Sequence, residues 1–287
     1  AGYVKQTRQQ VSSDQLLLVD CGDFLDRARP ETEGTLGTVN RSLIQAIGYD
    51  ALLLGNNEGL TYTFEQLDSF YRELSIPVVC ANFRPLYPDR KVNWLTPSLT
   101  VVKSGLKIGL IGLTAPFDEY YRLLGWHASD PFEAAYAEVK RLRGEVDAVI
   151  VMSHLGLRLD EQLAAEVPGI DLILGSHTHH LLEKPLYVGQ TAISAAGKFG
   201  THVGHLELFA GAEEKQIFIR GGCYPTDGWQ ADEEALSIIE VERERAKHRL
   251  SRVVAVLDEP LEWEPDRESP LSVLLAAAVR RKTGAEI

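Results

Sequence analysis

The strongest constraint on the fold is an alternation of short apolar runs with helical patterns. The runs lie at residues 16–20, 51–54, 147–152 and 171–175. Apolar runs of this length are typical of strands that are buried on both faces of a sheet. Between them, apolar residues spaced three and four apart predict amphipathic helices, as at residues 36–47. Strands that alternate with helices in this way predict an α/β fold with many parallel strands.

The remaining elements follow from the same rules. A polar loop is expected up to Gly34, and a β-hairpin around Ser104-Gly105. Thr63 and Gln66 form a capping-box pair at the start of a helix. Further helices are expected at 1–12, 131–143, 160–167, 231–250 and from 269 onward, and further strands at 78–81, 191–195, 202–209, 216–220 and 253–257. The three strands between 191 and 220 are expected to close the domain with an antiparallel part.

The charge of the chain limits its partners. The 287 residues include 29 basic and 41 acidic ones, a formal net charge of −12. A surface this negative repels nucleic acids and anionic membranes, so we expect neither as a partner. An anionic substrate would need a local source of positive charge, and bound metal ions are the usual one.

Three cysteines, Cys21, Cys80 and Cys223, are too few and too widely spaced for a disulfide framework. Free cysteines of this kind act as small buried hydrophobes and favour a reducing compartment, so the predicted location is cytoplasmic. No apolar run is long enough for a membrane-spanning helix. The chain begins at Ala1, without an initiator methionine or a signal peptide, and a secreted or cell-surface location therefore stays open.

Polar side chains that can bind a metal ion follow four of the apolar runs. They are Asp23, Asn56, His154, and the pair His177 and His179. Ligands in open α/β sheets bind beyond the carboxyl ends of the strands, so these side chains are expected to meet at one edge. Each of them alone has an ordinary interpretation as a turn residue, a helix cap or a loop histidine. Four such strand ends together favour a metal site.

The candidate ligands are one carboxylate, one amide oxygen and three imidazoles, without a cysteine. Such a set excludes a structural thiolate zinc site and suits divalent manganese, iron, cobalt, nickel or zinc. Five ligands are more than one four-coordinate ion with an open position needs. Two ions about 3.5–4 Å apart that share Asp23 fit better, and such a pair can clamp both oxygens of an in-line displacement at phosphorus.

Four motifs, in order, resemble a known family. They are Gly-Asp at 22–23, Gly-Asn-x-Glu at 55–58, Ser-His at 153–154 and Gly-Ser-His-Thr-His at 175–179. The set resembles the calcineurin-like metallophosphoesterase superfamily. The strings at 31–37, 55–59 and 112–117 are similar to those of its bacterial 5′-nucleotidase/UDP-sugar hydrolase type, the YunD-like branch. This resemblance, which covers residues 1 to about 225, implies a metallophosphatase-type β-sandwich flanked by helices (αββα).

The resemblance also implies a role for each candidate ligand. Asp23 would bridge two metal ions, with Asn56, His154 and His177 on the second ion and His179 on the first. The family begins with a strand that ends in Asp-x-His and supplies further ligands to the first ion. Nothing like that strand precedes Ala1 in the sequence as given, so the first ion would be held weakly or not at all.

Asn57 is a second departure from the family pattern. Asn57 stands where many relatives have a histidine that steadies the transition state or protonates the leaving group. An asparagine donates a hydrogen bond but cannot act as a general acid.

The resemblance also implies the domain boundaries. Residues 1–225 would be the metallophosphoesterase domain, 226–252 a linker helix and 253–287 the truncated start of a C-terminal nucleotidase-type α/β domain. The heavy charge of 231–250 indicates a solvated helix that joins two units.

The predicted function is a metal-dependent phosphoester hydrolase, 5′-nucleotidase-like or cyclic-nucleotide-phosphodiesterase-like, acting on a small nucleotide or related phosphoester. A metal-bridging hydroxide at Asp23 would attack phosphorus, and Asn57 would stabilise the developing charge. Two alternatives stay open. One is a protein that binds or senses nucleotide or phosphate with little turnover, which the asparagine at position 57 motivates. The other is a single-metal hydrolase of another bond. The oligomeric state is open as well.

Nearby polar residues are expected to lie outside the site. Glu58 is expected to order its own loop rather than bind metal. His180 is expected to face away from the ligands, because neighbouring residues of an extended segment point to opposite sides. Arg27 and Arg29 follow the Asp23 loop, and either contact phosphate or belong to a solvated loop.

Overall fold

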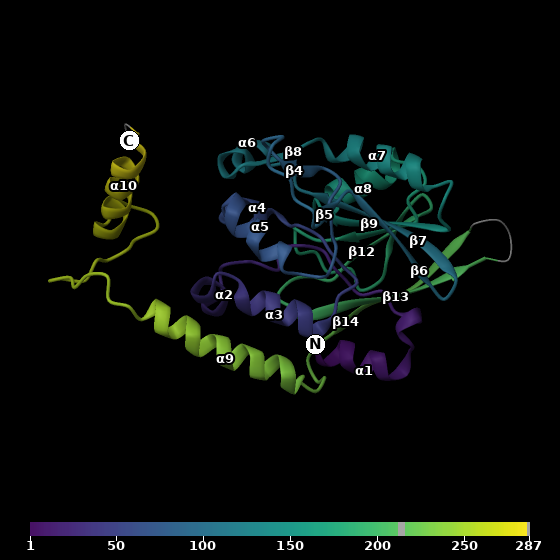
Figure 1. The fold of residues 1–287 in the computed structure, drawn as a ribbon, viewed down its shortest axis with the longest axis horizontal. Helices are drawn as coiled ribbons and strands as arrows, with labels where there is room; N and C mark the ends of the chain where they lie inside the picture. Colours follow the sequence, from purple (N-terminus) through teal and green to yellow (C-terminus); the bar gives the residue numbers. More distant parts are fainter. Residues whose placement is uncertain (212–215, 286–287) are drawn as a thin grey trace. The chain divides into compact units, whose positions relative to one another are not determined.

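Two β-sheets form the centre of the fold in the computed structural model, which describes residues 1–211 and 216–285 (Figure 1). The six-stranded sheet has the order β11 (Leu186–Val188), β12 (Thr191–Ala195), β10 (Leu172–Gly175), β9 (Ala148–His154), β7 (Leu106–Thr114), β6 (Ser98–Lys103). Its four inner strands are parallel, and the two edge strands are antiparallel to their neighbours. The four-stranded sheet is parallel throughout, with the order β1 (Val19–Asp20), β2 (Ala51–Leu52), β3 (Val78–Val79), β5 (Leu95–Thr96).

Two apolar layers cover the faces of the six-stranded sheet. In β7, Ile108 and Leu110 belong to a core shared with the four-stranded sheet and with helices α3 (Thr38–Ile47) and α5 (Phe64–Arg72). Ile111 and Leu113 belong to a second core with helices α7 (Pro131–Leu142) and α8 (Leu157–Glu166). This distribution explains why the strand sequences are continuously apolar, since both of their faces are buried. The layers are helices, sheet, sheet and helices, as predicted.

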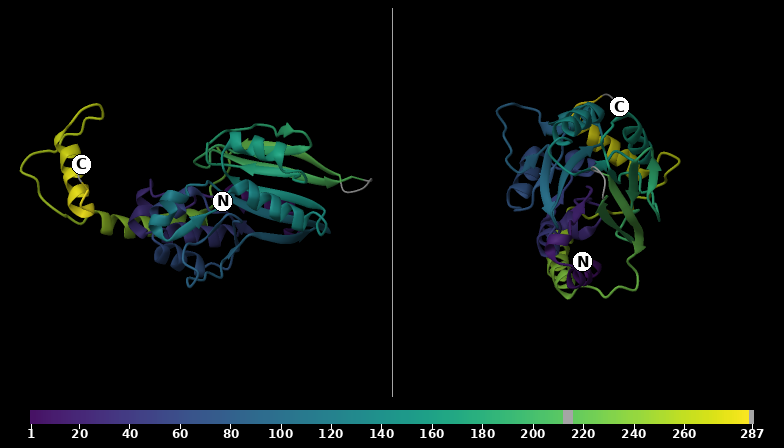
Figure 2. Two further views of the ribbon diagram at one scale, coloured as in Figure 1. Left: turned by 90° about the horizontal axis from the view of Figure 1, so that it is seen from above. Right: turned by 90° about the vertical axis from the view of Figure 1, so that its right-hand side faces the viewer.

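The remaining elements lie within residues 1–250, and the contacts assign all but Leu250 to one unit. They are α1 (Gly2–Gln10), α2 (Pro30–Thr35), α4 (Asn56–Thr61), α6 (Asp118–Tyr121), α9 (Glu233–Leu250), the 3-10 turns η1 (Ser13–Gln15) and η2 (Arg122–Leu124), the pair β4 (Phe83–Pro85) and β8 (Trp126–Ala128), and the ribbon of β13 (His202–Ala210) and β14 (Ile217–Pro225). Figure 2 shows that β13 and β14 run together as a long ribbon. The predicted capping box of α5 is present, with Thr63 and Gln66 as its pair. Asp130 caps α7, whose first residue is Pro131.

Residues 250–287 form a second unit, in which α10 (Pro270–Thr283) begins after Ser269 and ends at Gly284 in the left-handed region. The prediction of a strand at 253–257 is wrong. Val253, Val254 and Val256 are each more than 70% exposed and pair with no strand in the described chain. A β-branched run needs a neighbouring strand to satisfy its backbone, and propensity alone does not supply one.

Three other predictions need correction. The polar loop up to Gly34 contains helix α2, because Pro30 is preorganised for a first turn and acidic residues follow it. The run at 16–20 is only half-buried, because β1 is an edge strand that pairs with β2 alone. The strand at 191–195 is parallel to β10, so it belongs to the main sheet. The antiparallel pairing in this part of the chain comes from its neighbour β11 and from the β13–β14 ribbon.

The charged helix α9 is not solvated on all sides. Ala235, Glu242 and Ala246 are buried, and Arg243 forms an ion pair with Glu31 of α2 at 2.9 Å. The partition into domains at 225 and 252 therefore stays a prediction, whereas the contacts divide the chain after residue 249. None of the described helices is both long and apolar enough to cross a membrane.

Candidate active site at the strand ends

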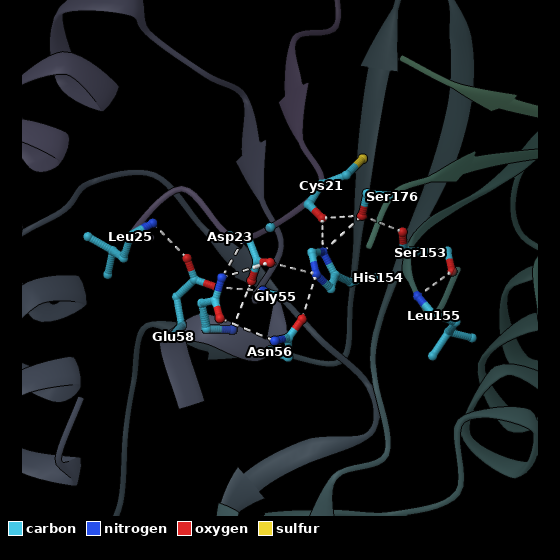
Figure 3. Close-up of polar contacts among 12 residues, drawn as sticks. Cys21, Asp23, Leu25, Gly55, Asn56, Glu58, Ser153, His154, Leu155 and Ser176 are labelled. Carbon is cyan, nitrogen blue, oxygen red and sulfur yellow. Dashed lines mark hydrogen bonds and ion pairs between the residues drawn. The ribbon is translucent and has the colours of Figure 1, made fainter. Parts of the chain in front are cut away.

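The carboxyl ends of strands from both sheets bring candidate residues together, and Figure 3 shows three of them, Asp23, Asn56 and His154. His154 is the last residue of β9, and His177 follows the end of β10 by two residues. The two strands are parallel with Gly175 opposite Ser153, so their ends lie level. From the four-stranded sheet, the loop after β1 supplies Asp23, and Asn56 is the first residue of α4, which follows β2. Parallel pairing thus places residues from distant parts of the chain at one edge.

Four of the five predicted ligands meet. The His154 Nε2 lies 3.2 Å from Asp23 Oδ2 and 3.1 Å from Asn56 Oδ1. The His177 ring lies 5.1 Å from the His154 ring between centroids. His179 is exposed, and within the described residues no hydrogen bond or ring contact joins it to the other four. The structure therefore groups Asp23, Asn56, His154 and His177 and leaves His179 at the rim.

The backbone carbonyl of Cys21 determines the tautomer of His154. His154 Nδ1 lies 2.7 Å from this oxygen, which can only accept, so Nδ1 carries the proton. In the neutral ring, Nε2 then presents a lone pair to the two side-chain oxygens. Burial disfavours the charged imidazole, but the hydrogen bond and charge of Asp23 outweigh it and raise the pKa of His154. Nε2 and the two oxygens converge on one point, which either a proton on Nε2 or a bound cation can occupy.

The donor set fits a divalent metal ion. A histidine that donates its other ring nitrogen to a backbone carbonyl is the usual arrangement of a metal-binding imidazole. Within residues 1–211 and 216–285, no three or more His, Cys, Asp or Glu side chains are arranged to hold an ion by themselves. The third close donor is the amide of Asn56, which lies outside those residue types. Oxygen and imidazole donors together suit manganese, iron, cobalt, nickel or zinc.

Backbone strain is concentrated at these residues. Asp23, His177 and His179 have positive φ values of 64°, 71° and 58°. Non-glycine residues in this region cost on the order of 1–3 kcal/mol each and are retained mainly where function requires them. The loops also touch closely: a Cβ on Gly22 would lie 2.5 Å from the Gly55 nitrogen, and one on Gly55 would lie 2.2 Å from Asp23 Oδ1. Glycine at both positions is therefore a condition for this site.

The Glu58 carboxylate links the Asp23 loop to Gly55 after β2. It is fully buried, and its carboxylate accepts the backbone N–H groups of Asp23, Leu25 and Gly55 at 3.1, 2.9 and 2.8 Å. Burial and the negative charge of Asp23 raise the pKa of Glu58 to about 7. Glu58 thus orders its own loop, as predicted, and the Asp23 loop as well.

Asn57 holds the Asp23 carboxylate. Its backbone N–H donates to Asp23 Oδ1 at 2.8 Å and its side-chain Nδ2 donates to Asp23 Oδ2 at 3.1 Å. Asn56 Nδ2 in turn donates to Asn57 Oδ1 at 3.3 Å, which orients Asn56 Oδ1 toward His154. The side chain of Asn57 is therefore engaged with a predicted ligand, and its catalytic role stays a prediction.

Sequence reasoning missed a supporting set of Ser153, Asp160 and Ser176. Ser176 Oγ contacts the Cys21 carbonyl and His154 Nδ1 at 2.7 and 2.9 Å. Asp160 of α8 is 1% exposed and accepts a hydrogen bond from Ser153 Oγ, the residue before His154. The other oxygen of Asp160 has no partner in the described chain. In the sequence, Asp160 resembles an ordinary acidic residue in a first helical turn, so no signal distinguishes it.

We expect Asp160→Asn to flatten the pH dependence of stability. Burial raises the pKa of Asp160 from 3.8 to about 7. The folded state therefore holds the proton more tightly, so the stability from this group is full below about pH 4 and is lost as pH rises through about 7. Relative to the variant, the wild type should lose up to roughly 4 kcal/mol of unfolding free energy between pH 4 and 8, measured by urea denaturation. The exposed neighbour variant Glu161→Gln should keep the wild-type profile, and an unchanged profile in Asp160→Asn would contradict the assignment.

Other polar candidates have partners elsewhere. Arg27 forms an ion pair with Glu33 and donates to the carbonyl of Thr61, so it braces a loop. Arg29 is exposed on the N-terminal side of α2. His180 is exposed, and its Nδ1 lies 2.8 Å from Thr178 Oγ1. These positions agree with a structural role for Arg27 and with the exclusion of His180.

Comparison of the sequence with known protein families assigns the chain to a family of phosphoesterases. A family model described as calcineurin-like phosphoesterase matches residues 3–181, and the chain belongs to this family. It is 33% identical over 283 residues to the uncharacterized metallophosphoesterase YunD of Bacillus subtilis, a match that covers 97% of this chain and 61% of that protein. It is 29% identical over 191 residues to the 5′-nucleotidase of Diplobatis ommata, a match that covers 63% of this chain and 32% of that protein.

Among solved structures, a 5′-nucleotidase precursor from Thermus thermophilus superposes with a TM-score of 0.77 at 24% identity. The match covers 99% of this chain and 60% of that one, so the chain spans about three fifths of the length of this protein. The likeness confirms the metallophosphatase-type fold that the family resemblance implied.

Proposed function

We propose that this chain carries the metal-binding half of a phosphoester hydrolase of the 5′-nucleotidase type. The observation that supports it most is the convergence of Asp23 Oδ2, Asn56 Oδ1 and His154 Nε2 within 3.2 Å, with His177 beside them. Its position at the strand ends of a calcineurin-like phosphoesterase fold points to hydrolysis at phosphorus. The relatives named 5′-nucleotidase point to a small nucleotide as substrate.

Asp23, Asn56, His154 and His177 would hold one divalent ion, and Asp23 would share a second ion with His179. When bound, such ions would act as Lewis acids toward the phosphoryl oxygens and the attacking water. In this proposal the residues 1–225 are the catalytic domain, 226–252 the linker and 253–287 the start of a nucleotidase-type domain.

The chain's own groups prepare the site for this chemistry. The Cys21 carbonyl and Ser176 keep a proton of His154 on Nδ1, so Nε2 would be the nitrogen that binds the ion. Asn57 keeps both oxygens of Asp23 oriented, and it leaves no general acid at position 57. Substrates whose leaving group needs no protonation should therefore react faster.

A nucleotide-binding or sensing protein with little turnover is the second candidate. The observation that favours it is the engagement of Asn57 with Asp23, because this amide neither donates a proton nor points freely toward a substrate. In this case the Asn57→His variant should gain hydrolytic rate over the wild type.

The decisive experiment measures phosphate release by the full-length protein after removal of metal with a chelator and reloading with Mn²⁺ or Co²⁺. We expect hydrolysis of nucleoside 5′-monophosphates that disappears with chelator and returns with metal. Calorimetric titration of AMP under the same conditions measures binding separately. Tight binding with no release above the metal blank would select the sensing protein, and neither binding nor release would reject both candidates.

A further inference from the structure

The His177 ring is held differently from the His154 ring. His154 Nδ1 lies 2.7 Å from the Cys21 carbonyl, and this hydrogen bond orients its imidazole. In the part of the chain that the structure describes, the His177 side chain takes part in no hydrogen bond or ion pair. A metal-binding imidazole usually donates its other ring nitrogen to an oxygen that orients it. Another kind of contact is therefore needed to orient His177 for an ion.

Two ring contacts restrict His177 instead. The centroid of its ring lies 5.1 Å from that of His154 and 5.9 Å from that of Phe117. The contact with Phe117 is T-shaped, with an angle of 62° between the ring planes, and aromatic rings prefer such an arrangement over a face-to-face sandwich. The ring torsion of a histidine is otherwise broad. Phe117 is thus the contact from outside the candidate ligands that limits the rotation of this ring.

Phe117 reaches His177 because of the place where strand β7 ends. Thr114, the last residue of β7, lies opposite His154 in the parallel pairing. The buried side chain of Asn82 accepts the N–H of Thr114 at 2.9 Å and donates to its carbonyl at 2.8 Å, which fixes this strand end. Phe117 follows Thr114 by three residues, so it emerges at the same edge of the sheet as the candidate ligands.

The Phe117 ring is itself supported. It packs against the apolar core between the two sheets, and its centroid lies 6.4 Å from that of the fully buried Tyr121. The Phe117 carbonyl accepts the N–H groups of Tyr120 and Tyr121, both at 3.0 Å, and its own N–H donates to the Ala115 carbonyl at 2.9 Å. The ring is therefore anchored through both its backbone and its packing, and it can hold the imidazole of His177 in one orientation.

We propose that Phe117 is a positioning residue, which holds the imidazole of His177 ready to bind a divalent ion. This rests on the proposed function, in which His177 is one of the ligands. The φ of His177, 71°, already directs the loop in a strained conformation, and Phe117 then restricts the ring. Order that exists before binding lowers the entropy lost on binding, so Phe117 should act on the affinity for the ion rather than on the chemical step.

The test measures Mn²⁺ binding to the full-length protein by equilibrium dialysis. Phe117→Leu keeps an apolar side chain but loses the aromatic ring, and it should raise the Kd for Mn²⁺ by roughly three- to tenfold. Phe117→Tyr retains the ring and should bind Mn²⁺ within about twofold of wild type. At saturating Mn²⁺, AMP hydrolysis by Phe117→Leu should return to within about twofold of wild type, because the affinity for the ion is what has changed.

Phe132→Leu is the matched control. Phe132 is a half-buried Phe of α7 that packs against the second apolar core, and the described chain shows no ring contact between it and a histidine. This variant should lose stability in urea denaturation as Phe117→Leu does, but it should keep the wild-type Kd for Mn²⁺. Equal weakening of Mn²⁺ binding in both variants would indicate a general loss of packing and would overturn the role of Phe117. Unchanged Mn²⁺ binding in a folded Phe117→Leu protein would overturn it as well.

A measurement without metal separates this proposal from the proposed function. In the chelated protein, NMR relaxation of the isotope-labelled His177 ring, assigned by its loss in His177→Ala, should give a lower order parameter in Phe117→Leu than in wild type or Phe132→Leu. A lower order parameter, together with no phosphate release by the wild type, would reject hydrolysis and keep Phe117 as the residue that orders His177. Equal order parameters in Phe117→Leu and the wild type would overturn the positioning role and leave hydrolysis standing.

Discussion

His154→Ala is expected to lower kcat for phosphoester hydrolysis by at least about 10³-fold, equivalent to about 4 kcal/mol of transition-state stabilisation. His154 is the residue on which the Asp23 and Asn56 oxygens converge, and it is 1% exposed. The substitution removes Nε2, the nitrogen that lies within 3.2 Å of both oxygens. The same variant should bind less Mn²⁺, which can be measured by equilibrium dialysis independently of turnover.

His180→Ala is the control for this prediction, because His180 lies in the same histidine-rich segment but is exposed and bonded to Thr178. Its activity and metal content should stay within about twofold of wild type. Because loss of a buried ring also leaves a cavity, thermal unfolding of His154→Ala must be recorded alongside. A folded His154→Ala protein with more than a tenth of wild-type activity and full metal content would contradict the assignment of His154 as a metal ligand.

Glu58→Ala is expected to lower the free energy of unfolding by about 3–5 kcal/mol. The buried N–H groups of Leu25 and Gly55 and the partly buried N–H of Asp23 would lose their acceptor, and each unsatisfied donor costs on the order of 1–3 kcal/mol. The loops that Glu58 joins carry Asp23 and Asn56, so activity should fall together with stability. Urea denaturation at constant pH measures the first effect, and phosphate release measures the second.

Glu65→Ala provides the comparison for Glu58→Ala. Glu65 is an acidic residue at the start of α5 that pairs with Arg90, and its side chain is 69% exposed. An exposed ion pair contributes about 0–1 kcal/mol, so this variant should stay close to wild type. If Glu58→Ala were no less stable than Glu65→Ala, the carboxylate would not be the link between the two loops.

Most of the layered fold could be predicted, because its strands carry a strong local signal. Strands β7, β9 and β10 are buried on both faces, and their continuous apolar runs follow from that burial. The edge strand β1 and the unpaired run at 253–257 were harder, because an apolar run does not state how many neighbours it has. Helix α2 was missed because its residues are largely polar and its start depends on Pro30.

The candidate ligands could be predicted because parallel strands present their carboxyl ends at one edge, and each of these ends carries a polar residue. The support around them could not be predicted. The Cys21 carbonyl that faces His154 is 133 positions away in the chain, and its backbone oxygen has no sequence signal. The left-handed conformations of Asp23 and His177 are likewise invisible in the sequence, because neither residue type requires them as a glycine would allow them.

By itself, the sequence determined the α/β layering, the family and the four strand ends that carry Asp23, Asn56, His154 and His177. These depend on periodicity and on short motifs, which are local properties of the chain. Only the tertiary structure decided that His154 Nε2 faces two oxygens, that Glu58 joins two loops, and that His179 stands exposed at the rim of the site. These depend on which backbone groups meet across distances of tens to hundreds of residues, and packing of the two sheets determines those meetings.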